Sequence, residues 1–398
     1  MRVLHVVPTY LPATRYGGPI HSVHGLCAAL ARVGHEVDVY TTSVDGPVDS
    51  DVAHDRPVER DGVQVSYFRS RRLRRLYWSP PMREALRRNI AMYDVVHLHS
   101  IFLWPTSMAA RIAERARVPY VVSPRGMLAP GPIHEKNRAA KLTWLTLVEA
   151  ETLGGAAAVH LTSERELREA RELPFPLPHA FVLPNGVDAP AEGFAARASA
   201  EARDAAAGEY ALFLGRLSWI KGLDRLLDAM AGTPVRLLMC GPDDDGHRAE
   251  LETRARLLGI ESQVRFFGAV AGDDKWTLVA GARFVVLPSY SESFGNAVIE
   301  AMAVGRPALV TDAVGTADLV HAAGAGIVCA GEPAALREAL LRLWRDRDAA
   351  EHMGAAGARY AREHLRWDAV ARAMAAHYRH LVRAHTHGHA AVDRPRGP

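Results

Sequence analysis

Two basic residues stand where a folded chain could hold an anion. Arg216 follows an apolar run that ends at Leu214, and Lys221 precedes an amphipathic segment, so one cation ends an expected strand and the other begins an expected helix. Unpaired N–H groups and the helix dipole favour anions at such places. The spacing therefore indicates a clamp for a diphosphate. Taken without the neighbouring glycines, the pair would read as ordinary solvated cations.

Two acidic residues follow in a second motif, Leu287 to Pro307. Glu292 lies in the loop after an expected strand and Glu300 on the helix that follows, so both can reach one elongated ligand at different points. A helix carboxylate can accept hydrogen bonds from two ribose hydroxyls, and the loop carboxylate can address an attached sugar. The expected helix N-terminus offers N–H groups to hydroxyl or phosphate oxygens, from Ser293, Phe294, Gly295 and Asn296.

The elements that must position these residues are short apolar strands alternating with helical segments. Runs such as Val3–Val7 and Ala211–Leu214 have the composition of buried parallel strands, and His21–Ala31 has helical spacing with Gly34 as a stop signal. We therefore expect an α/β protein with two Rossmann-like, doubly wound domains facing across a cleft. The predicted divisions are a first domain over 1–187, a linker over 188–208, a second domain over 209–366, a final helix at about 367–384 that packs back on the first domain, and a disordered tail over 386–398.

Together these motifs resemble those of the retaining glycosyltransferases of family 4, also called group 1, which have the GT-B fold. The resemblance covers nearly the whole chain and is carried by Gly17-Gly18-Pro19, Gly34–Val37, Val95–His99, Leu183–Asp188, Gly215–Gly222 and Glu292–Glu300. It implies that Arg216 and Lys221 hold the donor diphosphate, that Glu300 binds the ribose and that Glu292 lies beside the transferred sugar. It also implies that the Gly17-Gly18 loop approaches the phosphates.

One position departs from the family pattern. Members often carry a His-Gly pair after the strand that corresponds to Tyr120–Val122, whereas this chain has Arg125-Gly126. A fixed cation there indicates contact with the leaving phosphate or an acidic acceptor, and a structural arginine bridging loops is the alternative. His97 and His99 alternate along a strand and share a face. We expect His99, with Arg125, on the acceptor side, and His97 has the weaker claim.

Other classes of site find little support. No GxGxxG motif follows an expected strand, which argues against a nicotinamide enzyme. We interpret Asp243–Asp245 as a turn with a capping role and not as a metal site. The three cysteines are far apart and form neither a disulfide framework nor a zinc cluster. We expect no metal and no cofactor, because the nucleotide sugar would be a substrate.

The segment Arg69–Trp78 holds five arginines among leucines and aromatic residues, in a chain whose net charge is +3. Arginine with Trp and Tyr suits an anionic membrane surface. The alternatives are an ordinary solvated face and another polyanion, although no nucleic-acid recognition module accompanies the segment. No apolar stretch reaches bilayer length. We expect a cytoplasmic protein, with peripheral contact to the inner face of the cell membrane through this segment.

The resulting prediction is a metal-independent, retaining hexosyltransferase that uses a UDP- or GDP-sugar. Glu292, Arg216 and Lys221 are the expected catalytic residues, and the acceptor is a glycan or a lipid-linked glycan of cell-surface or exopolysaccharide synthesis. Two alternatives stay open. A sugar-nucleotide epimerase or hydrolase of the same fold would convert the donor without an acceptor, and a non-catalytic subunit would only bind the nucleotide sugar.

Overall fold

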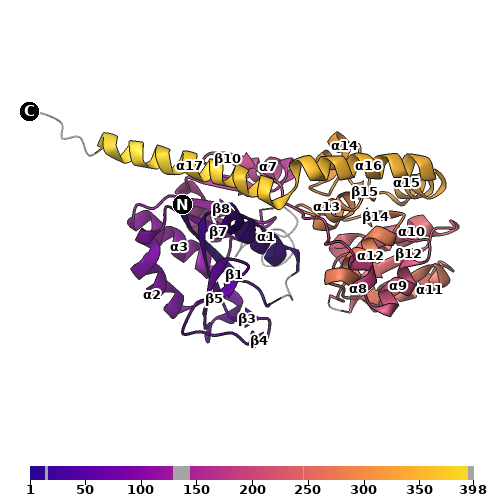
Figure 1. Ribbon diagram of the computed structural model, residues 1–398, viewed down its shortest axis with the longest axis horizontal. Coiled ribbons are helices and arrows are strands. Elements are labelled where there is room, and N and C mark those ends of the chain that lie inside the picture. Colours follow the sequence, from indigo (N-terminus) through magenta and orange to yellow (C-terminus); the bar gives the residue numbers. More distant parts are fainter. Residues whose placement is uncertain (14–16, 129–143, 245, 393–398) are drawn as a thin grey trace, which may run out of the picture. The chain divides into compact units, whose positions relative to one another are not determined.

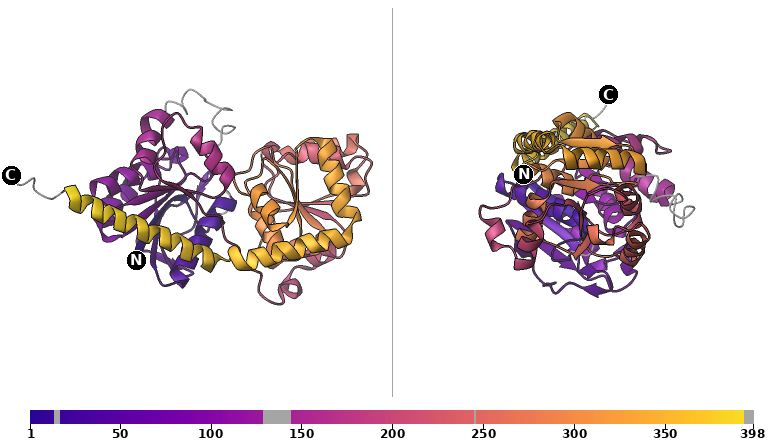
Figure 2. Two further views of the ribbon diagram at one scale, coloured as in Figure 1. Left: turned by 90° about the horizontal axis from the view of Figure 1, so that it is seen from above. Right: turned by 90° about the vertical axis from the view of Figure 1, so that its right-hand side faces the viewer.

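The computed structural model describes residues 1–13, 17–128, 144–244 and 246–392. The chain forms two compact units (Figure 1). Unit 1 comprises Met1–Gly186 and the C-terminal segment from Trp367, and unit 2 comprises Val187–Arg366. Each unit is built on its own mainly or wholly parallel sheet, with helices packed on both sides (Figure 2). The α/β class expected from the alternating strands and helices is confirmed.

Unit 1 contains an eight-stranded sheet in the order β10-β9-β8-β7-β1-β2-β6-β5, in which β5 alone runs antiparallel to its neighbour. Its strands are β1 (Arg2–Thr9), β2 (Glu36–Thr42), β5 (Val58–Arg60), β6 (Val63–Phe68), β7 (Val95–His99), β8 (Tyr120–Ser123), β9 (Ala158–Leu161) and β10 (Ala180–Val182), and β3 (Val44–Asp45) and β4 (Val48–Asp49) form a separate hairpin. Its helical segments are α1 (Gly18–Arg32), η1 (Arg74–Leu76), α2 (Pro80–Asn89), η2 (Ile90–Met92), α3 (Trp104–Arg115), η3 (Leu145–Glu149), α6 (Ala150–Gly154), α7 (Glu164–Arg171) and α17 (Trp367–Val392).

Both faces of the unit 1 sheet are buried, because consecutive strand residues point to opposite sides. On β1, Val3 belongs to the apolar cluster on one side of the sheet and Leu4 to the cluster on the other. This double burial explains why the strands read as continuous apolar runs in the sequence.

The C-terminal helix α17 belongs to unit 1 and lies beside α1 (Figure 1). Trp367 fits there because Gly25 and Gly186 have no side chain: a Cβ at either glycine would lie 2.5 Å from the indole ring. The helix continues to Val392, so the predicted end near residue 384 is too early. The rest of the predicted tail, 393–398, lies outside the described residues.

Unit 2 contains a six-stranded, wholly parallel sheet in the order β13-β12-β11-β14-β15-β16. Its strands are β11 (Ala211–Leu214), β12 (Leu237–Cys240), β13 (Val264–Gly268), β14 (Phe284–Leu287), β15 (Ala308–Thr311) and β16 (Gly326–Cys329). Its helical segments are α8 (Phe194–Arg197), α9 (Ala200–Ala206), η4 (Trp219–Lys221), α10 (Leu223–Met230), α11 (His247–Leu257), η5 (Glu261–Gln263), α12 (Gly272–Gly281), α13 (Asn296–Ala303), α14 (Ala317–Ala323), α15 (Pro333–Arg345) and α16 (Arg347–His364).

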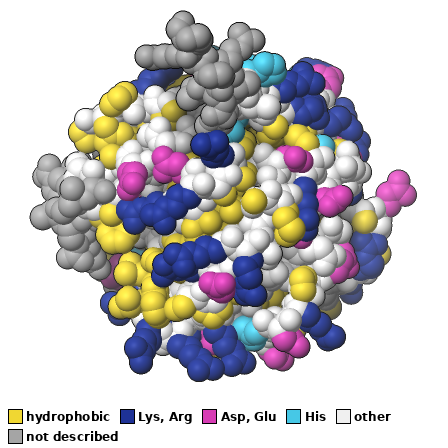
Figure 3. Space-filling model, turned by 90° about the vertical axis from the view of Figure 1, so that its left-hand side faces the viewer, with side chains coloured by type: hydrophobic (Ala, Val, Ile, Leu, Met, Phe, Trp, Pro, Cys, Tyr) yellow, Lys and Arg dark blue, Asp and Glu magenta, His cyan; other side chains and the backbone are white. Residues whose placement is uncertain are grey.

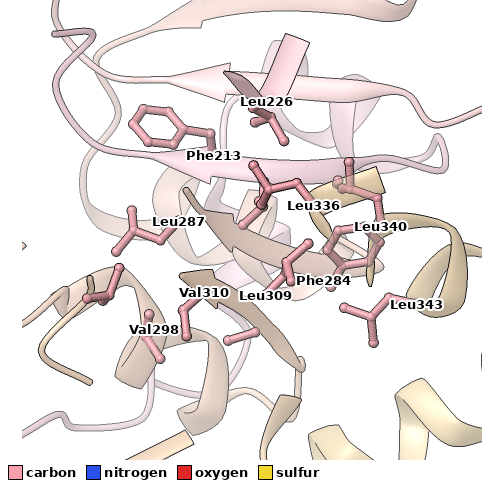
Figure 4. Close-up of a cluster of buried hydrophobic side chains, with 14 of the residues drawn as sticks. Phe213, Leu226, Phe284, Leu287, Val298, Leu309, Val310, Leu336, Leu340 and Leu343 are labelled. Atoms are coloured by element: carbon pink, nitrogen blue, oxygen red, sulfur yellow. The ribbon is translucent and has the colours of Figure 1, made fainter. Parts of the chain in front are cut away.

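The core of unit 2 fixes the strands that carry the acidic and basic motifs. Phe213 of β11 and Phe284 of β14 are fully buried, and they share one cluster with leucines of α10 and α15 (Figure 4). Burial of a large apolar side chain contributes about 1.5–3 kcal/mol. The ends of β11 and β14 are therefore held firmly beneath their loops.

The interpretation of 188–208 as a linker does not describe this segment. It contains helices α8 and α9, which belong to unit 2 and contact α12. Arg197 is paired with Asp273 at 2.8 Å, and the backbone N–H of Ser199 donates to Asp274 at 2.6 Å. Among the described residues, no helix is both long and apolar enough to cross a bilayer.

Candidate functional site

Two loops of unit 2 are fastened together at the carboxyl ends of the adjacent strands β11 and β14. The backbone N–H of Tyr290 donates to Ile220 O at 2.8 Å. Gly222 has a positive φ of 62°, and a Cβ there would lie 2.1 Å from Pro288 O. Only glycine at position 222 therefore allows the two loops to come this close. Arg225 adds hydrogen bonds to the carbonyls of the same loop. In open α/β sheets this edge binds ligands.

The fastening brings Lys221 and Glu292 into contact. Their side chains form an ion pair, with 16% of Lys221 and 18% of Glu292 exposed. The Glu292 backbone is itself fixed, because its N–H donates to Ala313 O at 3.1 Å and its carbonyl accepts from Gly315 at 2.8 Å. One cation and one carboxylate of the sequence prediction thus meet at a partly exposed position, seventy-one residues apart in sequence.

The other two predicted charges have different partners on the same edge. Arg216 pairs with Asp244 at 3.0 Å, and both side chains are well exposed. Glu300 pairs with Lys275 of α12 at 2.8 Å. Sequence reasoning missed Lys275, which lies on a different helix and carries no motif signal. Asp243 accepts from the Arg248 N–H at 3.0 Å, as expected of a capping aspartate, and Asp245 lies outside the described residues.

The N-terminus of α13 stands over the end of β14. Gly295 has a φ of 96°, and a Cβ there would approach Leu287 to 2.8 Å, so glycine is needed at this position. Phe294 is buried, and its carbonyl accepts from Thr316 at 3.0 Å. Its role is to hold the loop. Ser293 and Asn296, on either side, are half-buried next to the helix start.

In unit 1, the glycine motif lies at the start of α1. Gly17 has a φ of 70° and precedes the helix, which begins at Gly18. A Cβ at Gly17 would meet nothing within 4 Å, so conformation and not space requires glycine there. Residues 14–16, just before it, lie outside the described residues.

Beneath the carboxyl edge of the unit 1 sheet lies a buried chain of hydrogen bonds. His160 Nε2 donates to Leu183 O at 2.9 Å, so His160 Nδ1 accepts from the Ser123 hydroxyl at 2.7 Å. Ser123 Oγ accepts from His97 Nε2 at 2.7 Å, which leaves His97 Nδ1 to accept from the Tyr378 hydroxyl at 2.6 Å. His97, the weaker candidate of the sequence analysis, is thus a structural residue that ties α17 to the sheet.

A second chain begins at Arg125. A guanidinium only donates, so His99 Nδ1 accepts from Arg125 Nη2 at 3.3 Å, and His99 Nε2 donates to His5 Nδ1 at 2.9 Å. His5 Nε2 then carries a hydrogen that has no partner. His99 is 1% exposed, and Arg125 is half-buried. Of the two predicted acceptor residues, Arg125 is therefore the one that a ligand could touch.

These histidines are neutral. Burial, with a smaller contribution from the Arg125 charge, lowers the pKa of both His5 and His160 to about 3. Burial and the neighbouring charges also place the pKa values of His97 and His99 well below their usual range. A neutral imidazole is required by the hydrogen-bond directions above, so geometry and electrostatics agree.

His5, His97 and His99 lie close enough together to suggest a metal site, with one nitrogen of each within 4.8 Å of the others. The chemistry of the site argues against a cation. Both nitrogens of His97 are used in the hydrogen-bond chain, and His99 faces a guanidinium. A divalent ion there would be repelled by Arg125 and would displace hydrogen bonds of these histidines.

Comparison with known proteins identifies the family. Residues 17–186 match the glycosyl transferase 4-like domain, and residues 199–360 match the model of the glycosyl transferases group 1. The chain is 28% identical over 380 residues to the D-rhamnosyltransferase WbpZ of Pseudomonas aeruginosa, covering 90% of this chain and 91% of the relative. It is 27% identical over 369 residues to the O-antigen chain mannosyltransferase C of Escherichia coli, covering 89% and 91%.

Solved structures agree on the fold. A sucrose-phosphate synthase from Thermosynechococcus elongatus superposes with a TM-score of 0.75 at 22% identity, over 96% of this chain and 99% of that one. Anabaena HepE, solved in complex with UDP and glucose, gives 0.72 at 20% identity, over 94% and 98%. Two Rossmann-like units with this arrangement of motifs make up the GT-B fold. The chain belongs to the group 1 glycosyltransferases of family 4.

Proposed function

We propose that this glycosyltransferase transfers a sugar from a UDP- or GDP-sugar to a glycan or lipid-linked acceptor, with retention of configuration and without a metal. The contact between Lys221 and Glu292 at the partly exposed edge of unit 2 carries the proposal. A nucleotide-sugar donor is further supported by HepE, whose structures contain UDP, UDP-glucose or UDP with glucose. The relatives of O-antigen synthesis support a glycan acceptor.

The chemistry follows from where charge develops. When the bond between the sugar and the diphosphate breaks, negative charge grows on the phosphate and positive character on the sugar ring. We propose that Arg216 and Lys221 stabilise the first and that Glu292 stabilises the second. Lysine and arginine in these positions supply the charge that a metal ion supplies in other transferases, so the proposed reaction needs none.

In our proposal, donor binding rearranges the ion pairs that the structure shows without substrate. Lys221 is neutralised by Glu292, and Glu300 by Lys275. In our proposal the diphosphate takes over Lys221, which frees the Glu292 carboxylate to face the sugar, while the ribose hydroxyls bind Glu300. Gly17 and Gly18 of unit 1 and the α13 start, including Ser293, Phe294, Gly295 and Asn296, are proposed to offer N–H groups to the donor. Arg125 is proposed to contact the acceptor, and the buried His99 is proposed to hold the guanidinium in place through its hydrogen bond.

A donor panel tests this function. The full chain is incubated with UDP-, GDP- and ADP-sugars, with and without a lipid extract, and products are separated by mass spectrometry. A sugar bound to an acceptor, formed only with extract, is the expected result. Donor conversion without extract would favour an epimerase or hydrolase, and binding without conversion would favour a non-catalytic subunit. Either outcome overturns the proposal.

The proposal includes a membrane-facing surface on unit 1, which we call the arginine patch: Arg69, Arg71, Arg72, Leu73 and Arg75. All five side chains are exposed, Leu73 by 63%. On the face of unit 1 drawn in Figure 3, Lys and Arg side chains lie among hydrophobic ones. A bilayer with anionic lipids suits this mixture, because arginine binds the headgroups while an exposed apolar side chain enters the interface.

Arg74 is the structural member of this segment. It pairs with Asp49 at 2.7 Å and donates to the Val48 carbonyl at 2.7 Å, so the β3-β4 hairpin is tied to the patch. Val48 of this hairpin is a second exposed apolar side chain, with 59% of it exposed. The contacts of Arg74 thus join the β3-β4 hairpin to the segment that carries the exposed arginines.

Vesicle sedimentation tests the patch. Reversal of two charges, Arg71→Glu with Arg72→Glu, should weaken binding to vesicles of phosphatidylcholine with 30% phosphatidylserine by at least about tenfold, given about 1 kcal/mol per arginine. Reversal of Arg342 and Arg345, two exposed arginines of unit 2, is the matched control. Unchanged vesicle binding by the first variant would reject a membrane role.

A further inference from the structure

Among the described residues, Arg125 is a cation without a carboxylate partner. Its Nη1 donates to Asn185 Oδ1 at 3.0 Å and its Nη2 to His99 Nδ1 at 3.3 Å, and both acceptors are neutral. Its Nε is buried and has no hydrogen-bond partner in the part of the chain that is described. In the part of the chain that the structure describes, no ion pair reaches this guanidinium. Charged groups removed from water are normally paired, because an uncompensated charge is costly.

Glu166, whose charge acts on Arg125, does not form an ion pair with it. Glu166 is 1% exposed, and both of its carboxylate oxygens are in use. One accepts from the Gly126 N–H at 2.7 Å, and the other accepts from Thr162 N at 2.7 Å and from the Thr162 hydroxyl at 2.8 Å. Glu166 therefore fixes the turn that carries Arg125 and leaves the guanidinium unmatched.

The turn is also strained in a way that aims the side chain. Arg125 has a φ of 56°, in the left-handed region that residues other than glycine seldom occupy, and Gly126 follows at 80°. Conformations of this kind are unfavourable for residues other than glycine and are held in place by the surrounding structure, often at functional sites. Arg125 follows β8 at the carboxyl edge of the sheet, where a half-buried side chain can be reached from outside.

The buried histidines His99 and His5 cannot neutralise or replace the charge of Arg125. His99 and His5 are neutral and point a chain of hydrogen bonds away from Arg125. Among the described residues, Arg125 is thus the one full positive charge in this network, and its hydrogen bonds go to the neutral acceptors Asn185 and His99. Guanidinium groups bind phosphate oxygens strongly, because planar N–H pairs match the oxygen spacing.

We propose that Arg125 is the receptor for a phosphate oxyanion in unit 1. The proposal rests on the proposed function and deepens it, because it gives the substrate a phosphate group that contacts unit 1. That phosphate belongs either to the acceptor or to the donor diphosphate. In both cases the oxyanion supplies a negative counter-charge for Arg125, for which the described residues provide no carboxylate partner.

Phosphate binding without sugar transfer tests the site. The parent is the full chain with Arg216→Ala and Lys221→Ala, which silences the predicted clamp of unit 2. Calorimetric titration with inorganic phosphate and with pyrophosphate, at constant ionic strength, should show binding that Arg125→Gln weakens by at least about tenfold. Arg125→Lys should weaken it less. Arg115→Gln, which removes an exposed charge of α3 in the same unit, should change it by less than about twofold.

A second variant distinguishes phosphate binding by Arg125 from a purely structural role. Asn185→Asp places a carboxylate 3.0 Å from Nη1 in nearly the same shape, so it supplies Arg125 with an internal counter-ion. The variant should fold with an unchanged or higher unfolding midpoint and should lose phosphate binding by at least about tenfold. If it binds phosphate as tightly as the parent, Arg125 has only a structural role and the proposal is overturned.

The Asn185→Asp variant of the otherwise unaltered chain shows which substrate carries the phosphate, through its affinity for UDP and GDP and its KM for the acceptor. Weaker binding of UDP and GDP would assign the oxyanion to the donor, and a higher KM for the acceptor with unchanged UDP and GDP binding would assign it to the acceptor. No change in either would overturn the proposal. Because the first titrations involve no donor sugar, their result does not depend on whether the chain transfers one.

Discussion

Acidification from pH 7.5 to pH 5.5 should destabilise unit 1 through its buried histidines. His5 and His160 have pKa values of about 3 in the folded chain and 6.5 when exposed. Between these two pKa values, His5 and His160 therefore bind protons in the unfolded chain but not in the folded chain. Their contribution to stability is complete above pH 6.5 and is lost as the pH falls from 6.5 towards 3.

The magnitude follows from those two pKa values. Between pH 7.5 and 5.5 each such histidine shifts the unfolding equilibrium about tenfold, or about 1.4 kcal/mol, so His5 and His160 together give about 100-fold. His97 and His99, whose pKa values are also lowered, act in the same direction. Glu149 acts in the opposite direction, because burial raises its pKa and lets the folded chain take up a proton.

Hydrogen–deuterium exchange at the two pH values, corrected for intrinsic exchange, measures the loss of stability at β7 and β8 separately from that of unit 2. The amides of β7 and β8 should lose at least about 100-fold in protection. His160→Gln, whose amide can replace both hydrogen bonds, should remove about tenfold of that loss. His352→Gln, at an exposed site of unit 2, is the control. Equal protection at both pH values would show that these histidines are not buried neutral groups.

Two further predictions concern the packing that holds the sites. Gly222→Ala should lower the stability of unit 2 by about 1–3 kcal/mol, because the new Cβ meets Pro288 O and φ is positive, whereas Ala substitution at the open Gly208 should be tolerated; urea unfolding that treats both alike would contradict the close approach. Tyr378→Phe should cost about 1–3 kcal/mol by leaving His97 Nδ1 buried without a donor, and an unchanged unfolding midpoint would refute the hydrogen-bond chain.

The sequence predicted most of the sheet because its strands are buried on both faces. The run Ala211–Leu214 coincides with β11, and Val3–Val7 lies within β1. The short strand β5, Val58–Arg60, was missed, because it lies at an edge and is only partly buried. Helices α8 and α9 were missed for a similar reason, since each is a short, Ala-rich segment with little apolar periodicity.

The site was predictable where its residues follow strand ends and unpredictable where tertiary contacts choose the partners. Lys221 and Glu292 were each identified from a local motif, and sheet order brings them together. No motif indicates that Lys275 meets Glu300. The histidine chain is equally hidden, because parallel register places His5 beside His97 and a distant helix supplies Tyr378.

The rate of sugar transfer in clamp variants tests the central claim most directly. With donor at saturation, Lys221→Ala and Arg216→Ala should each reduce turnover by about 10²- to 10³-fold while the circular dichroism spectrum stays unchanged, because each removes a charge that stabilises the departing diphosphate. Arg248→Ala, which removes an exposed arginine of the same unit, should leave turnover unaltered. Near-normal turnover in either clamp variant would contradict the assignment of these cations to the donor phosphates.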